Sequence, residues 1–231
     1  RGGAGVPVIF IHGGFASLQM ALSEMKPYNW SWENDFAQHF DFIWYERRGC
    51  YRSPRPQDGY DLVKQAHDLL QLLDHLEVDV VHIIGSSAGG PIGIFFAAVY
   101  PERVHSLTLV GTALDLFPLG DKPSDIIRKQ LQILEQHDSE TAYEQRPNMV
   151  ETTVSVLWAK AEAKERGTLD AFTKRQKMMV ERAKNVSYSA RIAWYVAELR
   201  NIQAYIDFAL HVYVQKVNVP TMIVHGEYDR S

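Results

Sequence analysis

One serine in this chain stands in a setting typical of an enzymatic nucleophile. Ser87 is the middle residue of the sequence GSSAG at positions 85–89, which directly follows an apolar run at 80–84. A stretch with helical character follows at 91–100. A strand, a tight turn and a helix around a serine form the context of a nucleophile elbow, in which an activated hydroxyl attacks a carbonyl. The alternatives are an ordinary glycine-rich turn and a phosphate-binding loop, but the glycine and lysine spacing of phosphate-binding loops is absent.

A second glycine-rich loop could supply hydrogen-bond donors for the same chemistry. The sequence His-Gly-Gly at positions 12–14 follows the apolar run 6–11 and could bring a backbone N–H close to a bound carbonyl. We expect Gly14, or alternatively Phe15, to donate one hydrogen bond to an oxyanion, and the N–H of Ala88 to donate the other. The alternative is again an ordinary glycine turn.

Alternating strands and helices are expected to position these two loops. Apolar, β-branched runs predict four strands, at residues 6–11, 40–45, 78–84 and 106–110. Leucines at helical spacing predict an amphipathic helix over 60–76, and the second helix is expected over 91–100. The nearly continuous apolar character of the runs indicates strands buried on both faces. The alternation therefore predicts an α/β fold with a mostly parallel sheet flanked by helices.

The character of the chain changes after residue 113. Charged helical segments replace the strand pattern, with helices expected over 124–136, 149–166, 169–184 and 190–213. One more strand is then expected over 221–224. We therefore predict a core over residues 1–113, a helical cap or lid over 114–215, and a return to the core over 216–231. A separate helical domain is the alternative for the central part.

The motifs in this order resemble those of the α/β-hydrolase fold family, in its cap-bearing branch. Residues 12–14 resemble the family's oxyanion loop, residues 85–89 its nucleophile elbow, and residues 219–229 the strand that ends in the catalytic acid. The sequence ERRGCYRS at 46–53 resembles the family's Asp-x-Arg-Gly-x-Gly-x-Ser loop, with Glu46 in place of aspartate and Tyr51 in place of glycine. The resemblance implies the α/β-hydrolase fold with a helical cap insertion.

The resemblance also implies an acid and a base. In this family the nucleophile is followed by an acid and then by a histidine, so Asp229 would orient that histidine. Asp115 is a second acid position found in some relatives, and a helix cap is its alternative role. None of the nine histidines follows Asp229. We therefore expect this chain to be part of a larger protein whose final strand and helix follow, and which supplies the histidine. His12 and His225 are expected to hydrogen-bond their own turns.

The composition argues against several classes of protein. The net charge is −4 and the basic residues form no block, so a nucleic-acid partner is not expected. Apolar stretches such as 92–100 are far shorter than the ~20 residues of a membrane span. The single cysteine, Cys50, allows neither an intrachain disulfide nor a cysteine-rich metal site, and it favours a cytoplasmic setting. We expect a small-molecule substrate, no cofactor and no metal.

Together these features predict a serine hydrolase that cleaves a small, largely apolar ester or related acyl substrate through an acyl-enzyme on Ser87. A serine, where some relatives carry aspartate, argues against haloalkane dehalogenases and epoxide hydrolases. The candidate pocket residues are Phe15, Ser86, Trp158 and Trp194, with ordinary helix packing as the alternative for the tryptophans. A prolyl-aminopeptidase-like, lyase or cofactor-free peroxidase-like activity stays open, as does a non-catalytic ligand-binding or receptor protein.

Overall fold

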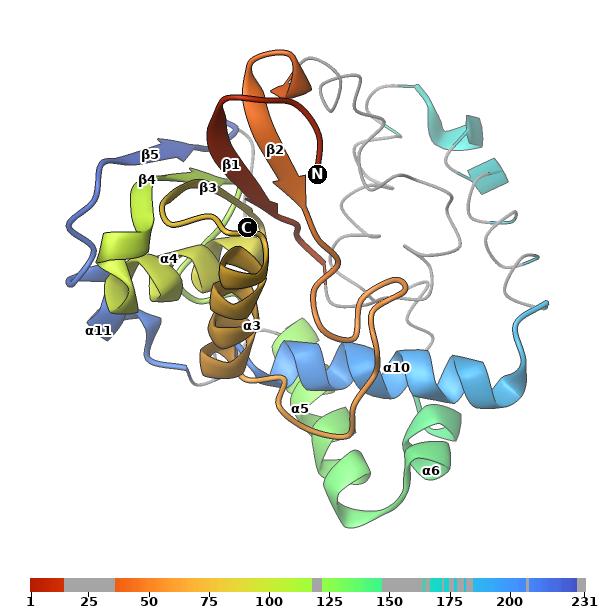
Figure 1. Ribbon diagram of the computed structural model, residues 1–231. Coiled ribbons are helices and arrows are strands. Elements are labelled where there is room, and N and C mark those ends of the chain that lie inside the picture. Colours follow the sequence, from red (N-terminus) through yellow and green to blue (C-terminus); the bar gives the residue numbers. More distant parts are fainter. Residues whose placement is uncertain are drawn as a thin grey trace.

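The computed structural model of this 231-residue chain is built on a five-stranded sheet (Figure 1). It describes residues 1–14, 36–117, 122–146, 164, 167–171, 173–174, 177, 181, 185–206 and 208–227. The strands are β1 (Val6–Ile11), β2 (Phe40–Trp44), β3 (Val81–Ser86), β4 (Val104–Val110) and β5 (Thr221–Val224). Their order is β2-β1-β3-β4-β5, and each neighbouring pair is parallel. The predicted parallel α/β architecture is confirmed.

The central strands are buried on both faces of the sheet. Ile9 and Ile11 of β1 belong to the large core cluster beneath the helices, whereas Val8 and Phe10 of the same strand pack with Phe42 on the opposite face. Successive side chains of a strand point to opposite faces, so one strand contributes to both clusters. Burial on both faces explains why these strands are continuous apolar runs in the sequence.

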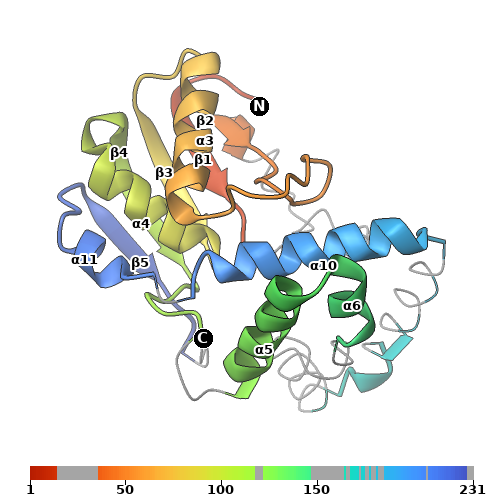
Figure 2. The same cartoon turned by 90° about the horizontal axis from the view of Figure 1, so that it is seen from below.

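Three helices form a layer on one face of the sheet, α3 (Leu62–His75), α4 (Gly89–Val99) and α11 (Leu210–Val214) (Figure 2). The carboxylate of Asp61 caps α3 by accepting a hydrogen bond from the Lys64 N–H at 2.8 Å. Helix α4 lies between the sheet, α3 and α11, and its residues 89–97 are all buried. The short 3₁₀ helix η1 (Pro101–Arg103) connects α4 to β4. Packing in this layer holds the start of α4 close to the end of β3.

A second group of helices lies between β4 and β5 in the sequence. It contains α5 (Lys122–Gln136), α6 (Ser139–Glu144) and α10 (Tyr188–Gln203), which pack around Leu131, Tyr143 and Leu199. The carboxyl ends of β1 and β2 point toward α10 (Figure 1). No helix in the part of the chain that the structure describes is long and apolar enough to cross a membrane.

The sequence prediction of one helix over 190–213 is wrong, because the chain turns between two helices there. Helix α10 ends at Gln203 and α11 begins at Leu210. In the turn, Phe208 packs against Phe95 of α4 with ring centroids 5.7 Å apart. Because this stretch contains neither proline nor glycine, tertiary packing ends the helix against its local propensity. The helix expected over 149–166 falls outside the described residues except at residue 164. Of the helix expected over 169–184, residues 169–171, 173–174, 177 and 181 are described, and all of them are helical.

Candidate active site

Ser87 occupies a sharp turn between β3 and α4. Its φ is 47°, a left-handed conformation that costs an L-residue about 1 kcal/mol. The Ser87 N–H donates to the Val110 carbonyl at 3.0 Å, and the Ser87 carbonyl accepts from the Gly90 N–H at 2.9 Å. A strained residue held on both sides in this way is what a strand-to-helix elbow requires.

Small residues allow α4 to begin this close to β3. A Cβ on Gly85 would lie 2.9 Å from the Gly89 carbonyl oxygen, which is closer than real Cβ atoms approach. Ala88 is fully buried and is the N-cap residue of α4. Backbone N–H groups at a helix start have no intrahelical partner and favour negative charge. Ala88 therefore lies where a donor to an oxyanion is needed, and its role as that donor stays a prediction.

The loop formed by residues 12–14, called the oxyanion loop below, lies directly against Ser87. A Cβ on Gly13 would lie 2.8 Å from the Ser87 Cβ and 3.4 Å from the Ser87 Oγ. Glycine is required for this approach, which arises because β1 and β3 are adjacent. Gly14 follows with a φ of 79°. The structure thus places Gly13 against Ser87, with Gly14 next in the chain. The role of Gly14 as an oxyanion donor stays a prediction, and Phe15 lies outside the described residues.

His12 braces the oxyanion loop in its neutral form. Its Nε2 accepts a hydrogen bond from the Arg47 N–H at 3.1 Å, so the proton sits on Nδ1, which lies 2.6 Å from the Gly13 carbonyl oxygen. Burial, followed by the charge of Arg47, lowers the pKa of His12 to about 3. The neutral ring fixes the loop, which is the role the sequence predicted for this histidine.

A buried guanidinium connects the oxyanion loop to the elbow. Arg47 is 1% exposed, and its donors reach the Gly14 and His12 carbonyl oxygens, the Gln65 amide oxygen and the Tyr205 hydroxyl. The Tyr205 hydroxyl in turn donates to the Ala88 carbonyl oxygen at 2.7 Å. Arg47 and Tyr205 therefore link the backbones of both loops. This link could not be predicted from the sequence, because 158 residues separate Arg47 from Tyr205 and no local pattern connects them.

The loop over 46–53 accommodates both of its departures from the family motif. Tyr51 adopts a φ of 44°, the left-handed conformation that glycine would adopt more cheaply. The Glu46 carboxylate accepts from the Arg52 N–H at 2.9 Å, and the Ser53 hydroxyl donates to the Glu46 carbonyl at 2.6 Å. Hydrogen bonds of the Glu46 and Ser53 side chains therefore hold the 46–53 loop, which contains Arg47, in its shape.

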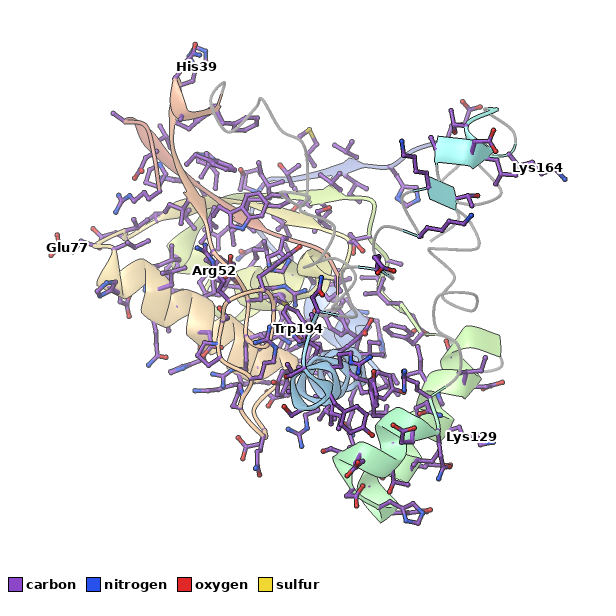
Figure 3. The ribbon with its side chains drawn as sticks, turned by 90° about the vertical axis from the view of Figure 1, so that its right-hand side faces the viewer. His39, Arg52, Glu77, Lys129, Lys164 and Trp194 are labelled. Carbon is purple, nitrogen blue, oxygen red and sulfur yellow. The ribbon has the colours of Figure 1, made fainter. Side chains whose placement is uncertain are left out.

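The remaining candidates from the sequence have varied surroundings. The guanidinium of Arg55 lies 3.6 Å above the ring of Trp194, which projects from α10 (Figure 3), and this favours the packing role for Trp194. Ser86, the last residue of β3, is half-buried. The Asp115 carboxylate accepts from the Phe117 N–H at 3.0 Å, so it caps a turn after β4. Outside the described residues lie Phe15, Trp158 and Asp229.

The residues that the structure describes contain neither a histidine partner for Ser87 nor a metal-binding cluster. In these ranges no hydrogen bond joins the Ser87 hydroxyl to a histidine. The same ranges contain no cluster of three or more His, Cys, Asp or Glu side chains that could hold a metal ion.

A serine on a strained strand-to-helix turn, beside a glycine loop from the adjacent parallel strand, is the arrangement expected in the core of an α/β hydrolase. The family comparison agrees with this geometry. The chain belongs to the alpha/beta hydrolase fold family, whose model matches residues 6–231.

Individual relatives extend the same assignment. The uncharacterized hydrolase YcgS of Bacillus subtilis is 36% identical over 107 residues, which is 46% of this chain and only 34% of that protein. A hydrolase from Pseudomonas aeruginosa has a similar structure, with a TM-score of 0.61 and 23% identity over 99% of this chain and 74% of that one. An esterase from Exiguobacterium antarcticum gives a TM-score of 0.58 with 19% identity, covering 96% of this chain and 73% of that one. The structural likenesses show the shared fold.

Proposed function

We propose that this protein is a serine hydrolase that cleaves a small, largely apolar ester or related acyl substrate. One observation carries the proposal, namely the left-handed Ser87 between β3 and α4 with Gly13 packed against its side chain. A hydroxyl displayed in this way beside backbone donors suits nucleophilic attack on a carbonyl. The relatives named as hydrolases and as an esterase support the same reaction class.

In the proposed reaction the Ser87 Oγ attacks the substrate carbonyl while a histidine takes its proton. The N–H groups of Ala88 and Gly14 stabilise the oxyanion, and the alcohol leaves with the proton from the histidine. Water then attacks the acyl-enzyme by the same route and releases the acid. Asp229 is proposed to orient this histidine.

His12 is unsuited to the role of this base. Its Nε2 accepts a hydrogen bond and its Nδ1–H faces the Gly13 carbonyl oxygen, so neither nitrogen is available to Ser87. The base is therefore proposed to be a histidine other than His12. A reducing, cytoplasmic setting is part of the same proposal, and the presence of a single cysteine, the buried Cys50, in these 231 residues supports it.

Covalent labelling of the full-length protein tests the nucleophile directly. We expect a fluorophosphonate probe to label the wild-type protein and the Ser106→Ala control, in which a serine of β4 is removed. Ser87→Ala should lose both labelling and hydrolysis of p-nitrophenyl butyrate. Undiminished labelling of Ser87→Ala would overturn the assignment. An unlabelled wild-type protein whose melting temperature rises with ligand and without turnover would favour a binding protein.

A further inference from the structure

The peptide group between Ser87 and Ala88 is held from its carbonyl side by a threonine. The Thr112 Oγ1 donates a hydrogen bond to the Ser87 carbonyl oxygen at 2.7 Å, and the Gly90 N–H donates to the same oxygen at 2.9 Å. This peptide group also carries the N–H of Ala88. Because the C=O and N–H of a trans peptide point in opposite directions, a donor fixed on the carbonyl directs the N–H to the other side.

The path of the chain after β4 explains how Thr112 reaches this carbonyl. The carbonyl of Val110, the last residue of β4, accepts the Ser87 N–H at 3.0 Å. Gly111 then turns the chain with a φ of 49°. A Cβ on Gly90 would lie only 2.3 Å from the Thr112 Oγ1, so the absent side chain of Gly90 leaves the space that the hydroxyl fills. Both backbone polar groups of Ser87 are thus bound to residues 110–112.

The oxyanion loop has the same construction on its own peptide group. The His12 Nδ1 lies 2.6 Å from the Gly13 carbonyl oxygen, and that peptide group carries the N–H of Gly14. Each of the two candidate oxyanion donors therefore belongs to a peptide whose carbonyl is bound by a side chain. A hydrogen bond on a carbonyl polarises its peptide and strengthens the opposite N–H as a donor, an effect of perhaps ~10–30% per bond.

We propose that Thr112 is a positioning residue for the oxyanion hole. Its hydroxyl orients and polarises the Ser87–Ala88 peptide group so that the Ala88 N–H stabilises the transition state more than the bound substrate. This inference rests on the proposed function of Ser87. Thr112 contacts the carbonyl of the nucleophile and acts through the Ala88 N–H.

Two variants of Thr112 and one matched control test this inference in the full-length protein. Thr112→Val removes the hydroxyl at nearly constant shape, Thr112→Ser keeps it, and Thr108→Val makes the same change within β4. We expect Thr112→Val to lower kcat for p-nitrophenyl butyrate by roughly tenfold with KM within about twofold, since it weakens one donor without deleting it. Thr112→Ser should stay within about threefold of wild type, and Thr108→Val should match wild type.

The affinity for an alkylboronic acid should change only if Thr112 acts on the oxyanion hole. It should not change if Thr112 only stabilises the fold. The boronic acid forms a tetrahedral adduct with a serine nucleophile, and one adduct oxygen occupies the oxyanion hole. We expect its inhibition constant to weaken across the variants in proportion to the loss of kcat/KM. Wild-type kcat and inhibition in Thr112→Val would overturn the role of Thr112, and so would equal losses in Thr112→Val and Thr112→Ser.

Fluorophosphonate labelling separates the failure of this inference from that of the proposed function. A wild-type protein labelled at Ser87 whose kcat is unaffected by Thr112→Val keeps the proposed function and refutes the role of Thr112. A wild-type protein that is neither labelled nor active refutes both. If Thr112→Val melts far below wild type, the comparison of Thr112→Ser with wild type in boronic acid affinity decides, because retained affinity supports the inference and lost affinity refutes it.

Discussion

The elbow and the oxyanion loop face each other across Ser87, but different contacts hold them. At Ser87 the elbow is bound to the Val110 carbonyl and to the neutral hydroxyl of Thr112, both from the adjacent strand β4 and its exit, and the Tyr205 hydroxyl binds the Ala88 carbonyl. The oxyanion loop is bound by the neutral ring of His12 and by Arg47, a buried charge from a separate loop. The elbow is therefore part of the sheet, whereas the oxyanion loop depends on ionisable groups. Three perturbations test this difference.

The largest effect is expected from Arg47→Met, which removes donors from the oxyanion loop and leaves the elbow's own contacts in place. We expect a loss of about 3 to 5 kcal/mol in the free energy of unfolding, because buried acceptors lose a charged donor. Urea denaturation measures this loss. The control, Arg48→Met, removes a partly exposed ion pair with Asp68 and should cost less than about 1 kcal/mol. Equal losses in the two variants would contradict the special dependence of the loop on Arg47.

A pH effect is expected next, and it should come from the oxyanion loop. Because the pKa of His12 is lowered to about 3 in the folded protein, its stabilising contribution is complete above the pKa of about 6.5 in the unfolded chain. That contribution is lost as the pH falls toward 3. Between pH 7 and pH 4 it amounts to about 3 kcal/mol.

Chemical denaturation of wild type and His12→Gln across this pH range measures the contribution of His12. The variant should lose less stability on acidification than wild type does. His39→Gln changes a histidine at the far end of the sheet (Figure 3) and serves as the matched control. Parallel curves for wild type and His12→Gln would show that the acid sensitivity has another source.

The smallest effect is expected from Tyr205→Phe. The hydroxyl that it removes contacts both the elbow and Arg47, which binds the oxyanion loop. This hydroxyl donates to the Ala88 carbonyl oxygen at 2.7 Å and accepts from Arg47 at 3.2 Å. Loss of one neutral hydroxyl should cost about 1 kcal/mol of stability and lower kcat about fivefold. A double-mutant cycle with Thr112→Val measures whether the two hydroxyls act together on residues 87–89. Strict additivity would show that Tyr205 serves the oxyanion loop alone.

The sequence predicted the features that a local pattern encodes. The elbow at 85–89 and the parallel strands follow from short apolar runs and glycine spacing, and the structure confirms β1 over the predicted residues 6–11. The Tyr205 contact could not be predicted in this way, since it joins residues far apart in the chain and depends on the unexpected turn after α10. The contact of Thr112 with the Ser87 carbonyl could not be predicted either, because a single threonine after a strand belongs to no periodic pattern. The packing of both residues against the elbow becomes apparent only in three dimensions.

The order of the strands sets the distance between the carboxyl ends of β3 and β5. Strands β3 and β5 lie on either side of β4, so their carboxyl ends are separated by two strand spacings, about 10 Å. The Ser87 N–H binds the Val110 carbonyl and the Gly111 N–H binds the Val224 carbonyl at 2.9 Å, so this interval is rigid. Under the proposed function, a serine that follows β3 and an acid that follows β5 would therefore be linked through a histidine between them and not by direct contact.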